Sequence, residues 1–452
     1  MQDRVVVWGI YMTGLRSGEG GDEEQLRPPP VLQVKVYGPC GAVVESSVKQ
    51  VWLPGPLIVG AGPAGLATAA CLKARGVPAL VLERERCAAS SWKLRTYERL
   101  RLHLPKKYCA LPLMPFPPEL PEYPTRQQFV DYLDRYVDHF ALAPFYGVEV
   151  AQAEYDPSLG FWRVRSAAAS AVADDGGGGG WEFVSRWLVV ATGENAEAVW
   201  PETISVEAFL GKVLHTSGYA KGDEHRGERV LVVGCGNSGM EVALDLCDND
   251  ANVSMVVRDK LHILPRDIFG ISTFGLSIFL LKWLPVKAAD AILLSIARLV
   301  LGDTGKYGIK RPSRGPLELK TATGKTPVLD VGTFAKIKSG QIKVVPDVNQ
   351  YTSRGAEFVD GTHREFDSII LATGYKSNVT SWLKFAYHKE EDFFSEKDGF
   401  PKTAFPHNWK GKNGLYATGF TRRGLLGASM DANKIAEDIA SQWNTKANPL
   451  EL

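Results

Sequence analysis

Apolar and polar positions in the first third of the chain predict a strand, a helix and a second strand. The apolar run Leu57–Val59 is followed by a glycine turn, an alanine-rich helix over residues 66–75 and a second apolar run, Ala79–Leu82, which leads into the carboxylate of Glu83. The turn has the spacing GxGxxG and consists of Gly60, Gly62, Pro63, Ala64 and Gly65 with Ala61 between the first two. This order of elements is that of a dinucleotide-binding βαβ unit.

Each glycine of this turn has its own physical reason. Gly60 permits a sharp exit from the strand, Gly62 lets the backbone approach a pyrophosphate, and Gly65 allows the helix to pack closely on the sheet. The helix N-terminus then directs its unpaired N–H groups at the phosphates. Glu83, 18 residues after Gly65, is placed to accept hydrogen bonds from ribose hydroxyls and would repel a 2′-phosphate. The site therefore favours FAD or NAD over NADP.

The same order of elements recurs over residues 229–259. An apolar strand, a glycine turn, a helix and a second strand follow one another, and the turn consists of Gly234, Gly236, Asn237, Ser238 and Gly239. Arg258 stands at the end of the second strand, where the first unit has a carboxylate. Because a guanidinium forms charge-assisted hydrogen bonds with a 2′-phosphate, this site favours NADPH, although the neighbouring Asp259 weakens the preference.

Two further apolar strands end in the same three residues. The segments RWLVVATGEN and SIILATGY carry Ala-Thr-Gly at 191–193 and 372–374, one after each nucleotide unit. Small residues there let the backbone approach a cofactor. The predicted fold class is α/β, with two Rossmann-like dinucleotide-binding domains and the second inserted into the first. The predicted boundaries are a divergent extension over 1–50, a discontinuous first domain over 51–222 and 346–446, and a second domain over 223–345.

Composition and charge exclude several classes of function. The 452 residues carry a formal net charge of +1, which leaves no cationic excess for a nucleic-acid partner. The six cysteines form no CxxC pair and have no metal-ligand spacing, so neither a dithiol reductase nor a metal site is expected. No secretory signal is recognisable, and charges and a proline interrupt the apolar stretch 274–301. We expect no transmembrane segment, leave a peripheral membrane contact open, and predict a cytoplasmic protein, with the cytosolic face of the endoplasmic reticulum as the alternative.

Aromatic and basic residues follow the first unit. The segment 90–108 contains Trp92, His103 and Lys106, and Arg84 directly follows the strand-end carboxylate. We predict that these side chains pack on a flavin ring or contact its phosphates. The alternative is an ordinary amphipathic surface segment.

Three later segments have simpler patterns. Six prolines in 111–124 predict an extended covering loop, and apolar residues at helical spacing predict a helix over 127–140. A C-terminal helix is also predicted. If its first turn, at 427–429, faces a flavin, its dipole would stabilise negative charge on the reduced ring.

Several motifs in fixed order resemble the class B flavin-containing monooxygenases and, within them, the plant YUCCA family. They are GAGPAGLATA, ATGEN, FxGxxxHxxxY (Phe209, Gly211, His215 and Tyr219), GCGNSGMEVALDL, LATGYKSNV and GFTRRGLLGASMDA. The resemblance extends from about Val51 to Trp443. It implies FAD in the first domain and NADPH in the second.

The resemblance also implies a reaction and residues that serve it. Indole-3-pyruvate would be oxidatively decarboxylated with O₂ to indole-3-acetic acid, the plant auxin, through a flavin C4a-peroxide. Asn195 and Asn237 would hold NADP⁺ and flavin in register, and His103 and Lys106 would contact FAD. His215 is expected to brace the junction of the two domains rather than to transfer protons.

The chain departs from the wider family in two places. The pattern YxSxxxNxxK, which starts here at Tyr97, has an asparagine where this chain has His103, so we expect a YUCCA-type pocket. Residues 1–50 match nothing expected of the family. Two other functions stay open: a general flavin monooxygenase that oxidises nitrogen or sulfur of small nucleophiles, and a non-catalytic nucleotide-binding sensor. The sequence does not predict the oligomeric state.

Overall fold

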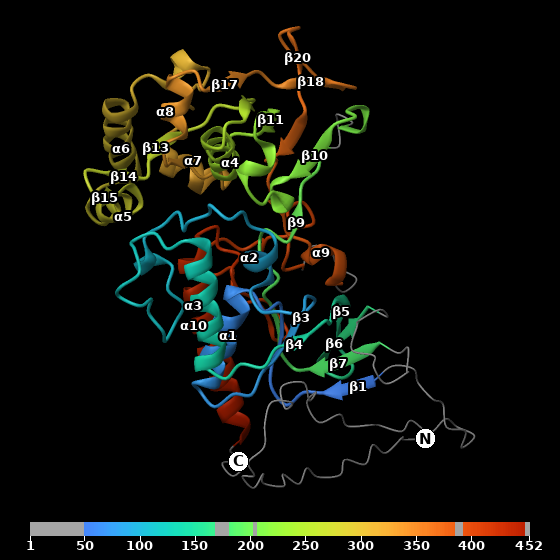
Figure 1. Cartoon of the computed structure of the whole chain (residues 1–452). Coiled ribbons are helices and arrows are strands. Elements are labelled where there is room, and N and C mark those ends of the chain that lie inside the picture. Colours follow the sequence, from blue (N-terminus) through green and yellow to red (C-terminus); the bar gives the residue numbers. More distant parts are fainter. Residues whose placement is uncertain (1–48, 168–179, 202–205, 385–391, 448–452) are drawn as a thin grey trace.

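The structure, a computed structural model, describes residues 49–167, 180–201, 206–384 and 392–447. These residues form two α/β units, one above the other in Figure 1. The predicted α/β fold class with two Rossmann-type units is confirmed. The predicted N-terminal extension lies outside the described residues apart from its last two, which begin a strand.

The first unit contains a parallel five-stranded sheet in the order β23-β8-β2-β3-β4. The strands are Leu415–Ala417, Leu188–Val190, Leu57–Val59, Leu80–Glu83 and Phe145–Tyr146. Alternate residues of a strand point to opposite faces, so the sheet has two cores. Ile58 and Val189 pack under the helices, whereas Leu57 and Val190 face a second, four-stranded sheet. The sheet is therefore covered on both sides, as parallel sheets usually are.

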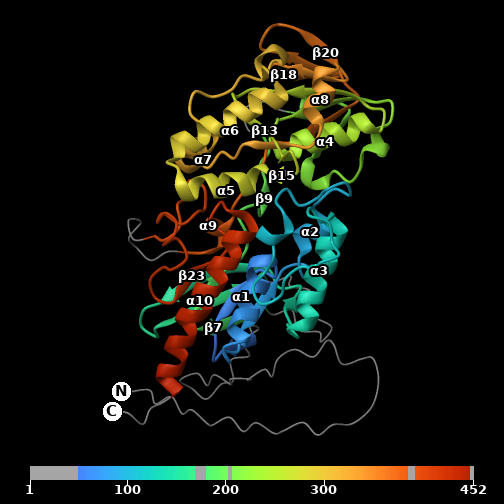
Figure 2. The same ribbon diagram turned by 90° about the vertical axis from the view of Figure 1, so that its left-hand side faces the viewer.

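The coverings of this sheet are helices on one side and strands on the other (Figure 2). The helices are α1 (Pro63–Lys73), α2 (Ser90–Leu94), α3 (Arg126–His139) and α10 (Gly424–Ala447), and a short α9 (Val379–Trp382) lies beside the second sheet. That sheet has the order β1-β7-β6-β5, with strands Lys49–Trp52, Trp181–Ser185, Phe161–Ser166 and Val150–Asp156. The predicted helix at 127–140 is confirmed as α3, whose start is fixed by a capping box between Thr125 and Gln128.

The second unit repeats the plan with a parallel sheet in the order β10-β21-β11-β12-β17. These strands are Lys212–His215, Ser368–Leu371, Arg229–Val233, Asn252–Val256 and Ile342–Val345. The helices of the unit are α4 (Asn237–Asp248), α5 (Thr273–Trp283), α6 (Val286–Leu301), α7 (Pro316–Thr323) and α8 (Thr333–Lys338). Its small ladders are β13 (Ile263–Pro265) with β16 (Val328–Asp330), β14 (Asp267–Ile268) with β15 (Ile271–Ser272), and β18 (Val348–Thr352), β19 (Gly355–Phe358) and β20 (His363–Glu365).

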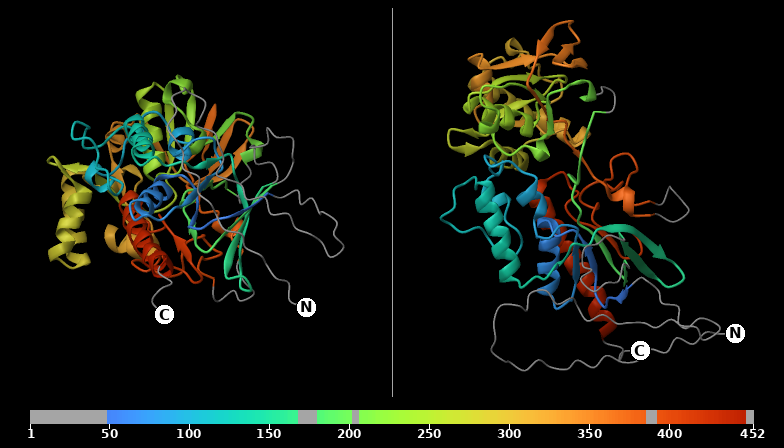
Figure 3. Two further views of the ribbon diagram at one scale, coloured as in Figure 1. Left: turned by 90° about the horizontal axis from the view of Figure 1, so that it is seen from below. Right: turned by 45° about the vertical axis from the view of Figure 1, so that its right-hand side comes forward.

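The five-stranded sheet of the second unit extends beyond the boundaries predicted for the second domain. Strand β10 begins at Lys212 and β21 ends at Leu371, whereas the predicted limits were 223 and 345. Both strands were assigned to the first domain because their partners are distant in sequence: β21 pairs with β10 on one side and β11 on the other. The two chain connections between the units therefore lie just outside this sheet, where β9 (Glu197–Ala198) pairs with β22 (Tyr375–Lys376) (Figure 3).

Candidate functional site

The first glycine turn is tight at two positions and open at the third. Gly60 has φ +109°, and a Cβ there would lie 2.6 Å from the carbonyl oxygen of Ala191; a Cβ on Gly65 would lie 1.9 Å from the oxygen of Gly60. A Cβ on Gly62 would meet no atom within 4 Å. Helix α1 begins there with no side-chain cap and with Pro63 in its first turn, so its N–H groups are free for a phosphate.

Glu83 is fixed at the end of β3, as the sequence predicted. The buried carboxylate accepts hydrogen bonds from the backbone N–H of Ala61 at 2.8 Å, from that of Glu85 at 3.1 Å and from the hydroxyl of Ser90 at 3.1 Å. A carboxylate has about four acceptor positions, so one is left for a ribose hydroxyl. The contact with Ala61 also ties the glycine turn to the strand end.

The second glycine turn has the same geometry. Gly234 has φ +116°, and a Cβ there would lie 2.5 Å from the oxygen of Ala372; a Cβ on Gly239 would lie 2.1 Å from the oxygen of Gly234. A Cβ on Gly236 would again meet nothing within 4 Å, and α4 starts without a side-chain cap. The two Ala-Thr-Gly segments thus touch the two glycine turns in equivalent ways, through Ala191 and Ala372.

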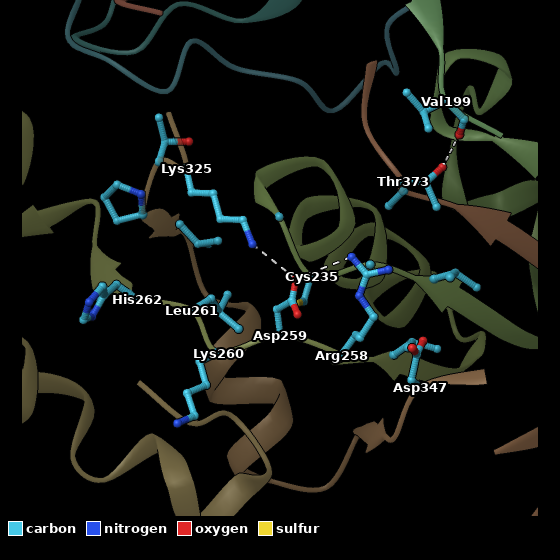
Figure 4. A pocket seen from close by; sticks show the side chains of 18 of the residues that line it. Val199, Cys235, Arg258, Asp259, Lys260, Leu261, His262, Lys325, Asp347 and Thr373 are labelled. Atoms are coloured by element: carbon cyan, nitrogen blue, oxygen red, sulfur yellow. Dashed lines mark hydrogen bonds and ion pairs between the residues drawn. The ribbon is translucent and has the colours of Figure 1, made fainter. Parts of the chain in front are cut away.

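The second turn opens into a cavity of about 550 Å³. Three cationic side chains line it, Arg258, Lys260 and Lys325. Arg258 and Lys325 converge on Asp259 at 3.4 and 3.3 Å (Figure 4). Burial would raise the pKa of Asp259, but Lys325 and Arg258 hold it below its usual range. Local spacing identified Arg258, whereas no local signal points to Lys325, which is 66 residues from Asp259 in the chain.

The cavity is suited to an anionic nucleotide. Its wall combines three cations with the open glycine of the second turn and the uncapped start of α4. The side chain of Arg258 is 70% exposed, so it is free to move onto a phosphate. Asn237, expected to contact NADP⁺, accepts a hydrogen bond from the N–H of Leu329 at 3.0 Å. This contact anchors β16 to the start of α4, and the role of Asn237 at the cofactor stays a prediction, as does that of Ser238.

His103 contacts the second unit. Its Nε2 lies 3.5 Å from Oε2 of Glu241 on α4, and the hydroxyl of Tyr97 donates a hydrogen bond to the same oxygen. Burial and the Glu241 carboxylate both raise the pKa of Tyr97. The segment that we expected only to line a flavin is therefore clamped to the helix of the other nucleotide site.

Lys106 binds the proline-rich loop, and its predicted contact with FAD stays a prediction. Its ammonium donates to the carbonyl oxygens of Pro117, Pro118 and Leu120 at 3.2, 2.8 and 2.5 Å. An ammonium has three N–H donors, and these three carbonyl oxygens can accept from all of them. The proline-rich loop that Lys106 holds contains no helix, as predicted, but it is not extended throughout, because the chain turns at 112–113 and 118–119.

The other side chains predicted to serve the cofactors differ in burial and in what they contact. Trp92 packs edge-to-face on Phe129 at 4.5 Å and contacts the cores of both units. Arg84 is half-buried beside the strand-end carboxylate, and Asn195 is exposed. His215 is buried and its Nε2 lies 3.1 Å from the carbonyl oxygen of Gly374, so it joins the two connections between the units, in keeping with the bracing role.

The junction of the units contains charged residues that the sequence did not reveal. Lys320 on α7 is partly buried and forms no hydrogen bond or ion pair with any described side chain. Burial and the nearby Arg423 lower its pKa, and Glu194 opposes them. Glu194 has a buried Oε2 without a hydrogen-bond partner within the described part of the chain, and burial raises its pKa. These residues are far apart in sequence, so only the fold brings them together.

The loop before α10 connects the two nucleotide sites. A Cβ on Gly419 would lie 3.0 Å from Cβ of Ala64 in the first turn of α1, and a Cβ on Gly324, at the end of α7, would lie 2.6 Å from Nη1 of Arg422. Helix α7 also lines the cavity of the second unit. Helix α10 begins at Gly424, three residues before the predicted turn, and runs parallel to α1, since Cys71 of α1 contacts Asn433. Both helix N-termini thus lie at the same edge.

Fold and site together define a two-dinucleotide α/β oxidoreductase. The family described as pyridine nucleotide-disulphide oxidoreductase matches residues 57–265. The cysteines of the described residues, which exclude Cys40, are all unpaired, and no group of three metal-binding side chains occurs among the residues described. The chain has neither the CxxC pair of a dithiol reductase in its sequence nor a described metal site.

Comparison with curated proteins gives the particular family. The chain is 55% identical over 394 residues to the probable indole-3-pyruvate monooxygenase YUCCA9 of Arabidopsis thaliana, covering 87% of this chain and 90% of that protein. It is 54% identical over 398 residues to the indole-3-pyruvate monooxygenase YUCCA1 of Oryza sativa subsp. japonica, covering 88% and 94%. The chain belongs to the YUCCA family of indole-3-pyruvate monooxygenases.

Solved structures share the fold. A flavin-containing monooxygenase from Stenotrophomonas maltophilia superposes with a TM-score of 0.62 at 18% identity, covering 87% of this chain and 99% of that chain. The complex of OTEMO with FAD and NADP gives a TM-score of 0.64 at 15% identity, covering 86% of each chain. At these identities the likeness concerns the arrangement of the two units.

Proposed function

We propose that this chain converts indole-3-pyruvate to indole-3-acetic acid, with FAD on the first glycine turn and NADPH on the second. The reaction consumes indole-3-pyruvate, O₂, NADPH and a proton, and yields indole-3-acetic acid, CO₂, NADP⁺ and water. The observation that carries the proposal is the loop before α10, which touches α1 through Gly419 and α7 through Arg422. A hydride moves only between groups in contact, and a loop that touches both units supports two nucleotide sites that face one another.

The residues of the chain would bind and orient the cofactors. Bound FAD supplies the hydride acceptor and the reaction with O₂. Glu83 would accept from the ribose of FAD, and the open Gly62 admits its pyrophosphate. Arg258, Lys260 and Lys325 would neutralise the 2′-phosphate of NADPH.

The substrate carries a carboxylate, and the junction offers a cation for it. We infer that Lys320 binds this carboxylate, with Arg423 adding positive charge nearby. Lys320 is partly buried and forms no ion pair with the described residues. The acid near it is Glu194, and because burial raises the pKa of Glu194, this carboxyl repels an incoming anion less than an ordinary glutamate would. The N-terminus of α10 starts next to Arg423 and adds its partial positive charge.

Product analysis tests the reaction. Purified protein with FAD, NADPH, O₂ and indole-3-pyruvate should yield indole-3-acetic acid and CO₂ in equal amounts, one per NADPH oxidised. Oxidation of an amine or a sulfide without decarboxylation of the 2-oxo acid would support the general monooxygenase instead. Protein that binds no FAD would favour the nucleotide sensor. The cytoplasmic location stays a prediction.

A matched pair of lysine variants tests the carboxylate site. Lys320→Gln should raise KM for indole-3-pyruvate by about tenfold, since a charge-assisted hydrogen bond contributes roughly 1.5–3 kcal/mol, and should leave KM for NADPH unchanged. Lys325→Gln, five residues on and lining the NADPH cavity, should do the reverse. Equal effects of both variants on both constants would contradict the assignment.

A further inference from the structure

Exposed apolar side chains are concentrated in one segment of the second unit. Of the sixteen large hydrophobic side chains that are exposed within the described ranges, nine lie between residues 269 and 300. They are Phe269, Ile271, Phe279, Leu281, Trp283, Val286, Ile292, Leu299 and Val300. Single exposed apolar residues are normal, but nine of them within one segment mark an interaction surface. We call these nine residues, together with Lys282, Lys287 and Arg298, the apolar–basic patch.

The elements that carry the patch lie together. The β14–β15 hairpin, α5 and α6 are neighbours on one side of the second unit (Figures 1 and 2), and α5 contacts both β15 and α6. On α5, Phe279 and Trp283 are four residues apart and share the outer face, whereas Thr273 and Ser277 are buried. Phe279 is 60% and Trp283 77% exposed, so neither belongs to a core.

The charge of this segment is opposite to that of the rest of the chain. Residues 269–314 contain seven lysines and arginines and two aspartates, a net charge of +5, whereas the whole chain carries +1, so the remainder carries −4. Both aspartates already accept hydrogen bonds from backbone N–H groups. Asp290 is buried and accepts hydrogen bonds from the N–H groups of Leu317 and Glu318 at 2.8 and 3.1 Å, and Asp303 accepts from that of Gly305. The exposed charge on α5 and α6 is therefore entirely cationic.

We propose that the apolar–basic patch docks the protein on an anionic phospholipid surface. Exposed apolar side chains beside lysines and arginines are what an interfacial membrane contact requires, because the apolar groups enter the acyl boundary and the cations pair with lipid phosphates. Helix α6, with 16 residues, is about 24 Å long and covers several headgroups. No helix in the described ranges is both long and apolar enough to cross a membrane, so the contact is peripheral.

The charge argues against a second copy of the chain as the occupant. A twofold interface would bring the same residues face to face and place a cationic segment against its like. Such juxtaposition is unfavourable, because α5 and α6 carry no exposed acid and the exposed Asp267 of the β14–β15 hairpin is already paired with Arg266 and Tyr123. Phospholipid headgroups supply the missing negative charge.

Co-sedimentation of the FAD-loaded protein with lipid vesicles tests the proposal. The protein should pellet with phosphatidylcholine vesicles in which about a third of the lipid is phosphatidylserine, less so with phosphatidylcholine alone, and less again as salt is raised. Phe279→Ser/Trp283→Ser should reduce the apparent affinity for both vesicle types by at least about tenfold, because both side chains leave water on binding. Lys282→Glu/Lys287→Glu should abolish the preference for phosphatidylserine.

Two control variants, with substitutions on the second unit outside the patch, test whether any similar change of surface residues alters vesicle binding. Leu210→Ser/Val359→Ser removes two exposed apolar side chains, and Lys338→Glu/Lys343→Glu makes the same charge change elsewhere. Both should bind vesicles like the original protein, and all four variants should keep their bound FAD and melting midpoint. Original protein that stays in solution with both vesicle types, or controls that lose binding equally, would overturn the proposal. A dimer in light scattering that Phe279→Ser/Trp283→Ser converts to monomer would assign the patch to a second copy instead.

Discussion

Glu83 and Arg258 occupy equivalent positions in the two units and differ in charge and in mobility. Glu83 is buried and held by three donors, so it offers a fixed acceptor for a neutral hydroxyl. Arg258 is largely exposed and has a single long contact to Asp259. An exposed guanidinium can move onto a phosphate dianion, because the opposite charges attract each other over several ångströms. The two residues would thus assign different nucleotides to two otherwise similar turns.

Replacing Arg258 should change the preference between nicotinamide cofactors. Arg258→Ala should raise KM for NADPH about tenfold and leave KM for NADH nearly unchanged, because only NADPH has the 2′-phosphate. Steady-state kinetics with both cofactors measure the ratio. Lys343→Ala, which removes an exposed cation elsewhere on the same unit, should change neither constant. An equal rise in both would contradict a phosphate contact.

Asp431 should make stability depend on pH. It is buried on α10, accepts a hydrogen bond from the N–H of Gly419 at 3.1 Å, and burial raises its pKa from 3.8 to about 7. A raised pKa means that its contribution is fully present below pH 3.8 and is lost as pH rises through about 7. Between pH 5 and 8 the protein should therefore lose roughly 2.5 kcal/mol of stability relative to Asp431→Asn, because about two of the three pH units between the two pKa values lie in this range. Thermal melts of both proteins across this range check it, and parallel curves would refute it.

At the scale of elements, residues near in sequence were predictable and distant contacts were not. Both βαβ units and the Ala-Thr-Gly strands follow from spacing, because a glycine turn and its helix are consecutive. The pairing of β10 with β21 joins residues 212 and 368, and it moved the domain boundaries. For Lys106 the sequence shows the basic character, but the carbonyl oxygens that it binds are known only from the fold.

The first glycine turn allows fold and cofactor binding to be separated. Gly60→Ala should lower the melting midpoint of the FAD-free protein, since the residue has φ +109° and its Cβ would lie 2.6 Å from the Ala191 oxygen. Gly62 has φ −75° and ψ 178°, which alanine adopts readily, and its Cβ would meet no atom. Gly62→Ala should therefore keep the melting midpoint and bind FAD at least tenfold more weakly. Flavin titration and calorimetry measure both, and a Gly62→Ala variant with full affinity would contradict the assignment.

At the scale of the whole molecule, the two units are held in a fixed relation by side chains as well as by the two connections. Tyr97 and Leu100 come from the first unit but pack in the core of the second. The hydroxyl of Tyr97 and the imidazole of His103 both contact the carboxylate of Glu241 on α4. At the surface, Arg99 pairs with Asp248 at 2.7 Å. The buried contact at Glu241 therefore sets the position of α4, whose first turn would hold the NADPH phosphates.

This clamp should control hydride transfer rather than binding. Glu241→Ala removes the acceptor shared by Tyr97 and His103, so α4 would no longer be held against the first unit. Hydride transfer requires the reacting atoms within about 3–3.5 Å, and a displacement of an ångström costs about a hundredfold in rate. Anaerobic reduction of FAD at saturating NADPH should slow by tenfold or more, with little change in NADPH affinity. Asp248→Asn, which breaks only the exposed pairs with Arg99 and Lys336, should slow it less than about twofold. If Glu241→Ala reduced its flavin at the original rate, the connections alone would align the two units.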